Sequence, residues 1–220
     1  MKKEKSKILV IGLGTGGAEI VDKIGQKCNF FKEVDYLCVN SDKKSLALKN
    51  TNIFLWDFGI ELYFPKEKYK RLFQKVMKFF VYRKKCLGCG GNWRIGEQIS
   101  LEHIDTIKNL MKDKEEIIII SCFGGGFGSG ASTVFAQIAK KLGIKTSAII
   151  TIPFDFEGRR KEAVAKNGID ELKKYVEKID IVDGQNILVP ENFKMTYYEA
   201  LQKKASEVEK IFVKKFIGVK

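Results

Sequence analysis

Five glycines fall within seven residues of the segment that begins at Gly124, and they are the clearest chemical signal in the chain. Glycine has no side chain to keep a ligand away, so the backbone N–H groups of such a run can close around an anion. Ser129 adds a hydroxyl that can reach a phosphate oxygen or a metal-bound water. A plain turn needs only one or two glycines, so we expect a phosphate-binding loop. Its candidate residues are Gly124, Gly125, Gly126, Phe127, Gly128, Ser129 and Gly130.

Two further glycine-rich segments have the same character. The first covers residues 12–17 and matches the G-x-G-x-x-G pattern of dinucleotide-binding proteins, which is a weak signal by itself. The second covers residues 86–96 and leads into a helical pattern. The candidate binding residues in these two segments are Gly12, Gly14, Thr15, Gly16, Gly17, Gly88, Gly90, Gly91 and Asn92.

The hydrophobic pattern indicates which elements position the loops. Ile117 to Ile120 form an unbroken apolar run before the 124–130 loop, as in a strand that is buried on both faces. After the loop, Ala131 to Leu142 place apolar residues at three- and four-residue steps, as a helix does. The same order recurs at residues 7–24, where a strand at 7–11 precedes the first loop. We expect further strands at 34–39 and 145–152.

This repetition predicts one α/β domain over residues 1–220, with a three-layer, doubly wound, mainly parallel sheet of the Rossmann-like type. Because ligands bind such sheets at the carboxyl ends of the strands, the three loops should meet at one edge. We also expect a helix at about 97–111, strand ends at 179–182 and 186–189, and a long last helix at about 196–217. An insertion at about 63–85 contains a basic amphipathic helix at 66–85.

The net charge of +13 favours anionic ligands and surfaces. It is carried mainly by scattered lysines with no nucleic-acid recognition motif, which argues against a nucleic-acid partner. We expect the 66–85 helix to pack on the domain with a solvated lysine face; the alternative is docking on an anionic membrane or in a partner groove. The N-terminus lacks a signal-peptide core, and no apolar run approaches the ~20 residues of a membrane span. These features predict a cytoplasmic protein.

The cysteines do not predict a disulfide framework or a metal site. There are five, an odd number without framework spacing, so we expect reduced thiols. Cys86-x-x-Cys89 is half of a zinc motif, no second pair follows it, and His103 is the single histidine.

The loops taken together resemble the nucleotide-binding domain of the FtsZ/tubulin family. Residues 123–131 are similar to the family signature GGGTGTG, with Phe127 and Ser129 in place of its threonines. Residues 12–19 resemble the first phosphate loop of FtsZ, and Asn40-Ser41-Asp42 resembles its NTD loop. Residues 87–96 follow its GLGAGANPEVG-type loop, and residues 152–158 look like its KPFNFEG sugar loop. The motifs agree in order and spacing over nearly the whole chain.

The resemblance implies a guanine nucleotide, GTP or GDP, with Mg²⁺ held through its phosphates. It implies that Glu157 accepts from the ribose hydroxyls and that Lys161 stands at a family arginine; the alternative for Glu157 is an acid at a helix N-terminus. Asn40 and Asp42 would position phosphate, water or Mg²⁺, or else cap the next helix. Asn186 would take the place of the guanine-reading asparagine.

Some departures from the family weaken base recognition and hydrolysis. Leu201 and Ala205 stand where FtsZ has a stacking phenylalanine and a polar base reader, so we expect lower base selectivity. The acidic loop that follows the family's central helix is absent from the printed sequence, so we expect weak or no GTP hydrolysis by this chain alone.

The resemblance implies a cytoskeletal, cell-division or filament-regulating protein that self-associates or meets an FtsZ-like filament. Two other functions remain open. An NAD(P)-dependent oxidoreductase would use Gly12, Gly14 and Gly17, with Asp35 or Asp42 on the ribose. A nucleotide-free adaptor would use the same fold to cap or recruit filaments.

Overall fold

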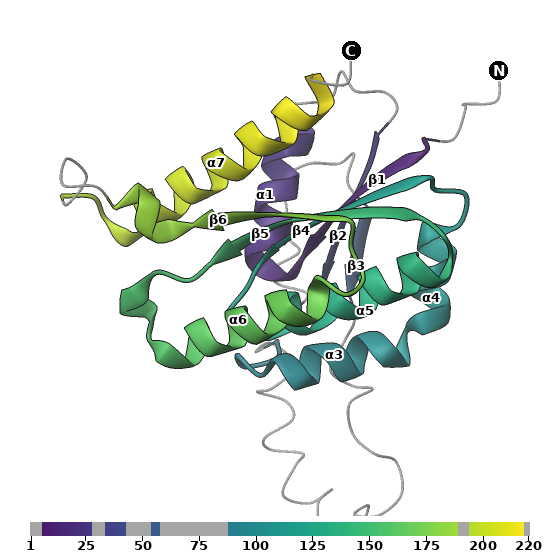
Figure 1. Ribbon diagram of the computed structural model, residues 1–220, viewed down its shortest axis with the longest axis horizontal. Coiled ribbons are helices and arrows are strands. Elements are labelled where there is room, and N and C mark those ends of the chain that lie inside the picture. Colours follow the sequence, from purple (N-terminus) through teal and green to yellow (C-terminus); the bar gives the residue numbers. More distant parts are fainter. Residues whose placement is uncertain (1–5, 28–33, 43–53, 58–87, 189–193, 218–220) are drawn as a thin grey trace, which may run out of the picture.

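The computed structural model describes residues 6–27, 34–42, 54–57, 88–188 and 194–217 (Figure 1). The expected insertion at 63–85, with its basic helix, lies outside the described residues.

Six parallel strands form one sheet in the order β3-β2-β1-β4-β5-β6. Every described pair of neighbouring strands is parallel. The predicted Rossmann-like α/β fold is confirmed. The strands are β1 (Ile8–Leu13), β2 (Val34–Asn40), β3 (Phe54–Asp57), β4 (Glu116–Cys122), β5 (Lys145–Ile152) and β6 (Lys178–Asp183).

The helices cover both faces of the sheet and make the three layers visible in Figure 1. Helices α1 and α7 pack on one face, and α3, α4, α5 and α6 pack on the other. The helices are α1 (Gly14–Lys27), α3 (Trp93–Glu102), α4 (Ile104–Met111), α5 (Phe127–Lys141), α6 (Arg159–Leu172) and α7 (Tyr197–Ile217). Two 3₁₀ turns, η3 (Asp155–Glu157) and η4 (Gly184–Ile187), follow β5 and β6.

The isoleucine run of β4 shows why these strands are apolar without alternation. Ile117 and Ile119 join the core under α3 to α6, whereas Ile118 and Ile120 join the core under α1 and α7. All four side chains are fully buried. Successive side chains of a strand point to opposite faces, so a sheet covered on both sides needs apolar residues at every position.

Two expected elements differ from the structure. The helix expected at 97–111 is two helices, because the chain breaks at His103, whose ring bonds the carbonyl of Ile99 at 2.8 Å. That carbonyl is the one that the backbone N–H of His103 would use in a continuous helix; the N–H bonds the Ser100 carbonyl instead. The strand end expected at 186–189 is also wrong: residues 184–187 form η4, since the side chain of Asp183 accepts from the Gln185 N–H at 2.9 Å.

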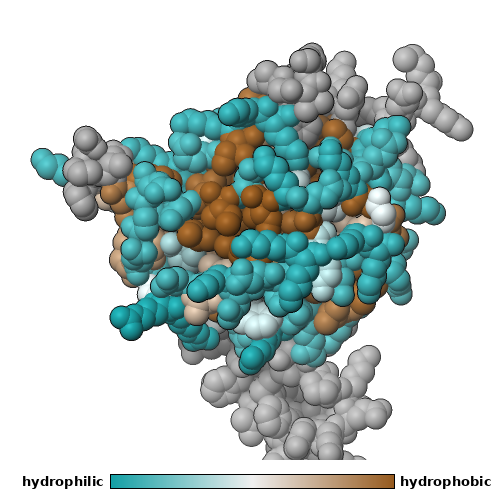
Figure 2. All heavy atoms as spheres, in the orientation of Figure 1, coloured by the Kyte–Doolittle hydropathy of each residue, from teal (hydrophilic) through white to brown (hydrophobic). Residues whose placement is uncertain are grey.

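Strand β6 is the outer strand of the described sheet on its side. Figure 2 shows apolar side chains gathered on the face between α7 and α6, and Ile181 of β6 is 45% exposed. A groove of about 570 Å³ runs between β6, η4 and α7. Within the described part of the chain, none of the helices combines the length and the apolar character needed to span a bilayer.

Candidate functional site

A cavity of about 610 Å³ lies at the carboxyl ends of the strands, where all three glycine loops meet. The 12–17 and 124–130 loops arrive there because β1 and β4, the strands that precede them, are parallel and end at the same edge. Of the residues singled out in the sequence, those that line the cavity are Gly14, Thr15, Gly16, Asn40, Asp42, Gly88, Gly90, Gly91, Gly124, Gly125, Gly126, Phe127, Gly128, Glu157 and Lys161.

The loop at residues 12–17 (the first loop) turns sharply from β1 into α1. It contacts the loop at residues 124–130, which we call the third loop; the second loop is at residues 86–96. Gly14 has φ +74°, and a Cβ there would lie 3.0 Å from the backbone nitrogen of Gly128. Helix α1 begins at Gly14 and α5 begins at Phe127, and both residues line the cavity. The two helix N-termini therefore present partial positive charge to the cavity, which favours an anion.

The 124–128 segment is held in shape by the chain around it. Gly124 has φ +95°, and a Cβ on it would lie 2.5 Å from Cγ of the Pro153 ring. A Cβ on Gly126 would lie 2.6 Å from Cys89 Cβ, so the second and third loops are in contact. At Gly125, by contrast, a Cβ would meet no atom within 4 Å. The loop therefore has a packed side and an open side.

The second loop also has an open side. Gly90 and Gly91 have φ +55° and +74°, which favours glycine, and a Cβ on either would meet nothing within 4 Å. The thiol of Cys89 lies 3.1 Å from the Ser41 hydroxyl, which ties this loop to the end of β2.

Asn40 connects the end of β2 to the first loop. Its side chain is buried, donates to Thr15 Oγ1 at 3.1 Å and accepts from the Ser41 N–H at 2.8 Å. Asp42, two residues later, lines the cavity. Asn40 thus connects the end of β2 to the first loop, and Asp42 is part of the cavity wall.

Glu157 and Lys161 form an ion pair at the edge of the cavity. Glu157 Oε2 accepts from Lys161 Nζ at 2.8 Å, and Oε1 accepts from the Phe154 N–H at 3.1 Å. Burial alone would raise the pKa of Glu157, but the hydrogen bonds from Lys161 and Phe154 outweigh it and lower the pKa below its usual value. Both carboxylate oxygens of Glu157 thus already accept a hydrogen bond from the protein. This agrees with the alternative that Glu157 is an acid at a helix N-terminus. A ribose hydroxyl would have to share these oxygens with Phe154 and Lys161.

Six residues proposed from the sequence do not line the cavity. Ser129 is turned inward and accepts from the Gly124 N–H at 3.0 Å, so it shapes the loop from behind. Asn92 caps α3 by accepting from the Arg94 N–H at 3.1 Å. Asn186 is exposed in the groove beside α7, outside the cavity.

The other three are glycines at tight crossings. A Cβ on Gly12 would lie 2.6 Å from the Gly17 carbonyl oxygen, and one on Gly17 would clash with the Ile120 carbonyl. A Cβ on Gly130 would clash with the backbone of α3 at Trp93 and Glu97. These glycines let α1 approach the sheet and α5 approach α3.

Of one wall of the cavity, the sequence analysis singled out only Leu201 and Ala205. It comes from α1, the end of β4 and the first turns of α7, and its members are Glu19, Ile20, Lys23, Cys122, Tyr197, Tyr198, Leu201, Gln202, Lys204 and Ala205. The helical spacing of 197, 201, 204 and 205 was a usable signal, because residues at three- and four-residue steps share one face. Lys23 and Gln202 are hydrogen-bonded and so join α1 to α7.

The thiols and acids of the described residues make no metal centre. Cys38, Cys89 and Cys122 are free thiols, and burial raises the pKa of each. Within the same residues, no group of three or more His, Cys, Asp or Glu side chains is arranged to hold a metal ion.

Comparison with protein families gives a match of residues 7–189 to the model described as "Tubulin/FtsZ family, GTPase domain". The chain is 32% identical over 181 residues to the cell division protein FtsZ of Buchnera aphidicola, which covers 82% of this chain and 41% of that protein. It is 30% identical over 214 residues to FtsZ of Aquifex aeolicus, covering 97% of this chain and 50% of that protein. The chain therefore spans about half the length of these relatives.

Solved structures share the fold. An empty FtsZ dimer from M. jannaschii superposes with a TM-score of 0.76 at 24% identity, over 94% of this chain and 53% of that one. The GDP-bound monomer of CetZ1 from Haloferax volcanii superposes with a TM-score of 0.70 at 20% identity, over 93% of this chain and 58% of that one.

Proposed function

Because the chain belongs to the Tubulin/FtsZ family, we propose that it binds a guanine nucleotide, GTP or GDP, in the cavity at the carboxyl edge of the sheet. The observation that carries this proposal is that three glycine loops and the N-termini of α1 and α5 line one cavity. Open glycine backbone and helix N-termini together suit an anion with several charged oxygens. We also propose that residues 1–220 form one domain of this kind.

In this proposal the phosphates lie against the 14–16, 88–91 and 124–128 segments, where the backbone is open. The ribose lies near Glu157 and Lys161, and the base lies toward α7, where Leu201 and Ala205 offer apolar contact. Mg²⁺ would bind through the phosphate oxygens, with Asp42, which follows β2 and lines the cavity, as a candidate carboxylate. Because Asn186 lies outside the cavity, base recognition would depend on other residues.

The contact between the loops favours this function over an NAD(P)-dependent oxidoreductase. A dinucleotide needs only the first loop for its pyrophosphate. In this structure all three loops are in contact, since Gly14 of the first loop packs against Gly128 of the third, and Gly126 of the third packs against Cys89 of the second. A nucleotide-free adaptor would have no use for the open backbone at Gly90, Gly91 and Gly125.

The biological setting is proposed from the relatives. The Buchnera relative is named a cell division protein, and one structural neighbour is titled an FtsZ dimer. We propose that this chain likewise serves in a cell-division or filament system, by self-association or by meeting an FtsZ-like filament. We expect little GTP hydrolysis by the chain alone, which phosphate release would measure. Docking of residues 66–85 on an anionic membrane stays an alternative from the sequence.

Calorimetric titration with GTP, GDP, ATP and NAD⁺ tests the proposal. We expect binding of GTP or GDP; tight binding of NAD⁺ without either guanine nucleotide would contradict it. Gly125→Asp and Gly125→Asn make a matched pair, since the added atoms have room at this position. The new carboxylate should repel the phosphates and weaken binding by about tenfold or more relative to the neutral amide.

A further inference from the structure

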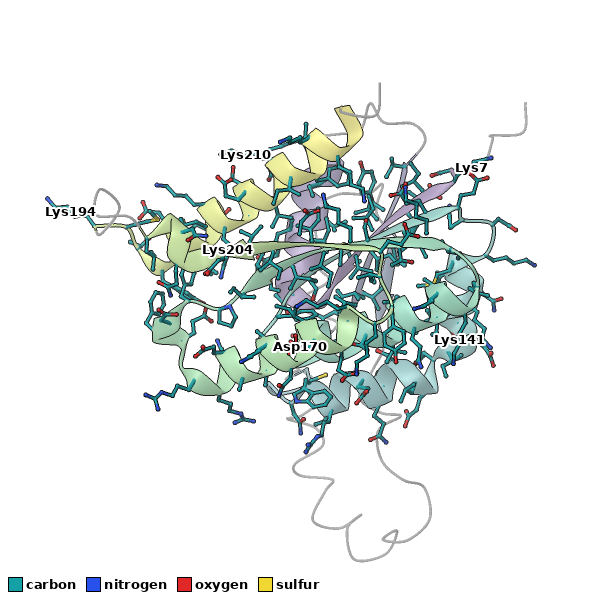
Figure 3. All side chains as sticks on the ribbon, in the orientation of Figure 1. Lys7, Lys141, Asp170, Lys194, Lys204 and Lys210 are labelled. Carbon is teal, nitrogen blue, oxygen red and sulfur yellow. The ribbon has the colours of Figure 1, made fainter. Side chains whose placement is uncertain are left out.

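Lys204 places a buried ammonium group in the wall of the cavity. The residue is only 5% exposed, although it belongs to a helix whose other lysines are mostly at the surface. In Figure 3 Lys204 and Lys210 lie on different sides of α7, and Lys210 belongs to the groove beside β6. Burying an ammonium is costly unless the charge is compensated, so lysine is rarely buried to this degree.

The protein compensates this charge only in part. Lys204 Nζ donates to the Ile152 carbonyl at 2.8 Å and lies 3.9 Å from the centre of the Phe154 ring. These contacts use a neutral carbonyl and an aromatic face, and neither cancels the charge. Burial lowers the pKa of the Lys204 ammonium, against the opposing effect of Cys122, Glu157 and Asp183.

The nearby carboxylates are engaged elsewhere. Glu157 is paired with Lys161 at 2.8 Å, and Asp183 accepts from the Gln185 N–H at 2.9 Å. Among the residues that the structure describes, no acidic side chain comes within 4.0 Å of the Lys204 ammonium. An ammonium has three N–H donors, and the Ile152 carbonyl accepts one of them.

The cavity itself points to what would complete the compensation. Lys204 shares it with the glycine loops and the two helix N-termini, which favour an anion. The lysine is also close to the end of β5 and to the Phe154–Glu157 turn, so its charge acts on the part of the ligand that lies nearest this turn.

We infer that Lys204 is a nucleotide-contacting residue whose ammonium donates to the phosphate next to the ribose. This inference rests on the proposed nucleotide binding and adds to it a side-chain cation that neither the glycine loops nor the Glu157–Lys161 pair supplies. Charge-assisted hydrogen bonds to phosphate are among the stronger polar contacts.

The test compares Lys204→Met with Lys203→Met, since Lys203 is the adjacent, exposed lysine and lines the separate groove between β6, η4 and α7. Calorimetry would measure the dissociation constants of GDP and of guanosine, which has no phosphate. We expect Lys204→Met to weaken GDP binding by about tenfold to a hundredfold. Guanosine binding should change by no more than about twofold, and so should GDP binding by Lys203→Met.

Thermal melting separates a ligand contact from a structural role. Without nucleotide, Lys204→Met should melt at the same temperature as the unchanged chain or higher, because a buried charge is removed. The rise in melting temperature on adding GDP should shrink. If Lys204→Met does not fold, Lys204→Gln is measured in the same way, and failure of both to fold would show that the lysine is structural and overturn the inference.

The remaining outcomes are equally decisive. Equal GDP affinity of Lys204→Met and the unchanged chain overturns the inference while leaving the proposed nucleotide binding intact. Equal losses for GDP and guanosine also overturn it, because the phosphate contact would then be absent. If the unchanged chain binds neither GTP nor GDP, the proposed function itself fails.

Discussion

The side-chain amide of Asn40 donates to Oγ1 of Thr15 at 3.1 Å, which fastens the end of β2 to the loop between β1 and α1. The other end of the amide accepts from the Ser41 N–H at 2.8 Å. One buried side chain thus sets the relation between two segments that both line the cavity.

Replacing Asn40 should loosen the cavity as well as the fold. Asn40→Ala leaves the Ser41 N–H and the Thr15 hydroxyl without this partner, and we expect a loss of about 1–3 kcal/mol in the free energy of unfolding. Thr15→Val removes only one of the two hydrogen bonds and should cost less. Urea unfolding of both variants measures the difference, and an Asn40→Ala variant as stable as the unchanged chain would contradict the structural role of the amide.

The crossing of α5 over α3 should tolerate no side chain at Gly130. A Cβ there would clash with backbone atoms of Trp93 and Glu97, which cannot move aside as a flexible side chain can. We expect Gly130→Ala to lower the free energy of unfolding by about 1–3 kcal/mol or more.

Gly125→Ala is the matched control for that prediction. Its Cβ would meet nothing within 4 Å, so its stability should stay within about 0.5 kcal/mol of the unchanged chain. Thermal and urea unfolding followed by circular dichroism would report both. Equal stability of the two variants would show that the glycine at 130 is not needed for packing.

The ion pair between Glu157 and Lys161 should make stability depend on acid pH. The pKa of Glu157 is lowered from its ordinary 4.5 in the folded chain, so its contribution is fully present above that value. This contribution is lost as the pH falls from about 4.5 through the lowered folded-state pKa. The unfolded chain is protonated at Glu157 first, and protonation in the folded chain then removes the favourable charge interaction with Lys161.

The measurement is the difference in free energy of unfolding between the unchanged chain and Glu157→Gln across this range. The difference should be largest at neutral pH and shrink as acid is added. Glu162→Gln is a suitable control, because Glu162 is an exposed acid in the first turn of α6. A difference that stays constant with pH would mean that the folded-state pKa of Glu157 is not lowered.

Periodicity and local composition were enough to predict the sheet and the approximate place of the site. The four isoleucines of β4 required cover on both faces, and strand–loop–helix repeats imply parallel strands that end at one edge. The break at His103 was not predictable from periodicity, because a ring-to-carbonyl bond interrupts a pattern that continues in the apolar residues.

The roles of individual loop residues could not be predicted from the sequence. All the glycines looked alike in the sequence, yet Gly90, Gly91 and Gly125 leave open space while Gly12 and Gly130 make room for neighbouring backbone. The hydroxyl of Ser129 looked suited to a phosphate and instead bonds the Gly124 N–H. These differences depend on which segment approaches from elsewhere in the chain.

By itself the sequence determined that the chain is a parallel α/β protein with glycine loops at the ends of its strands, because side-chain periodicity and backbone freedom are local properties. Tertiary structure alone decided that Lys204 is buried in the cavity wall and that Asn186 lies outside it. The reason is physical: burial and the direction of a side chain are set by contacts between elements distant in sequence, as when Lys204 of α7 contacts Ile152 at the end of β5 and Phe154 beside η3.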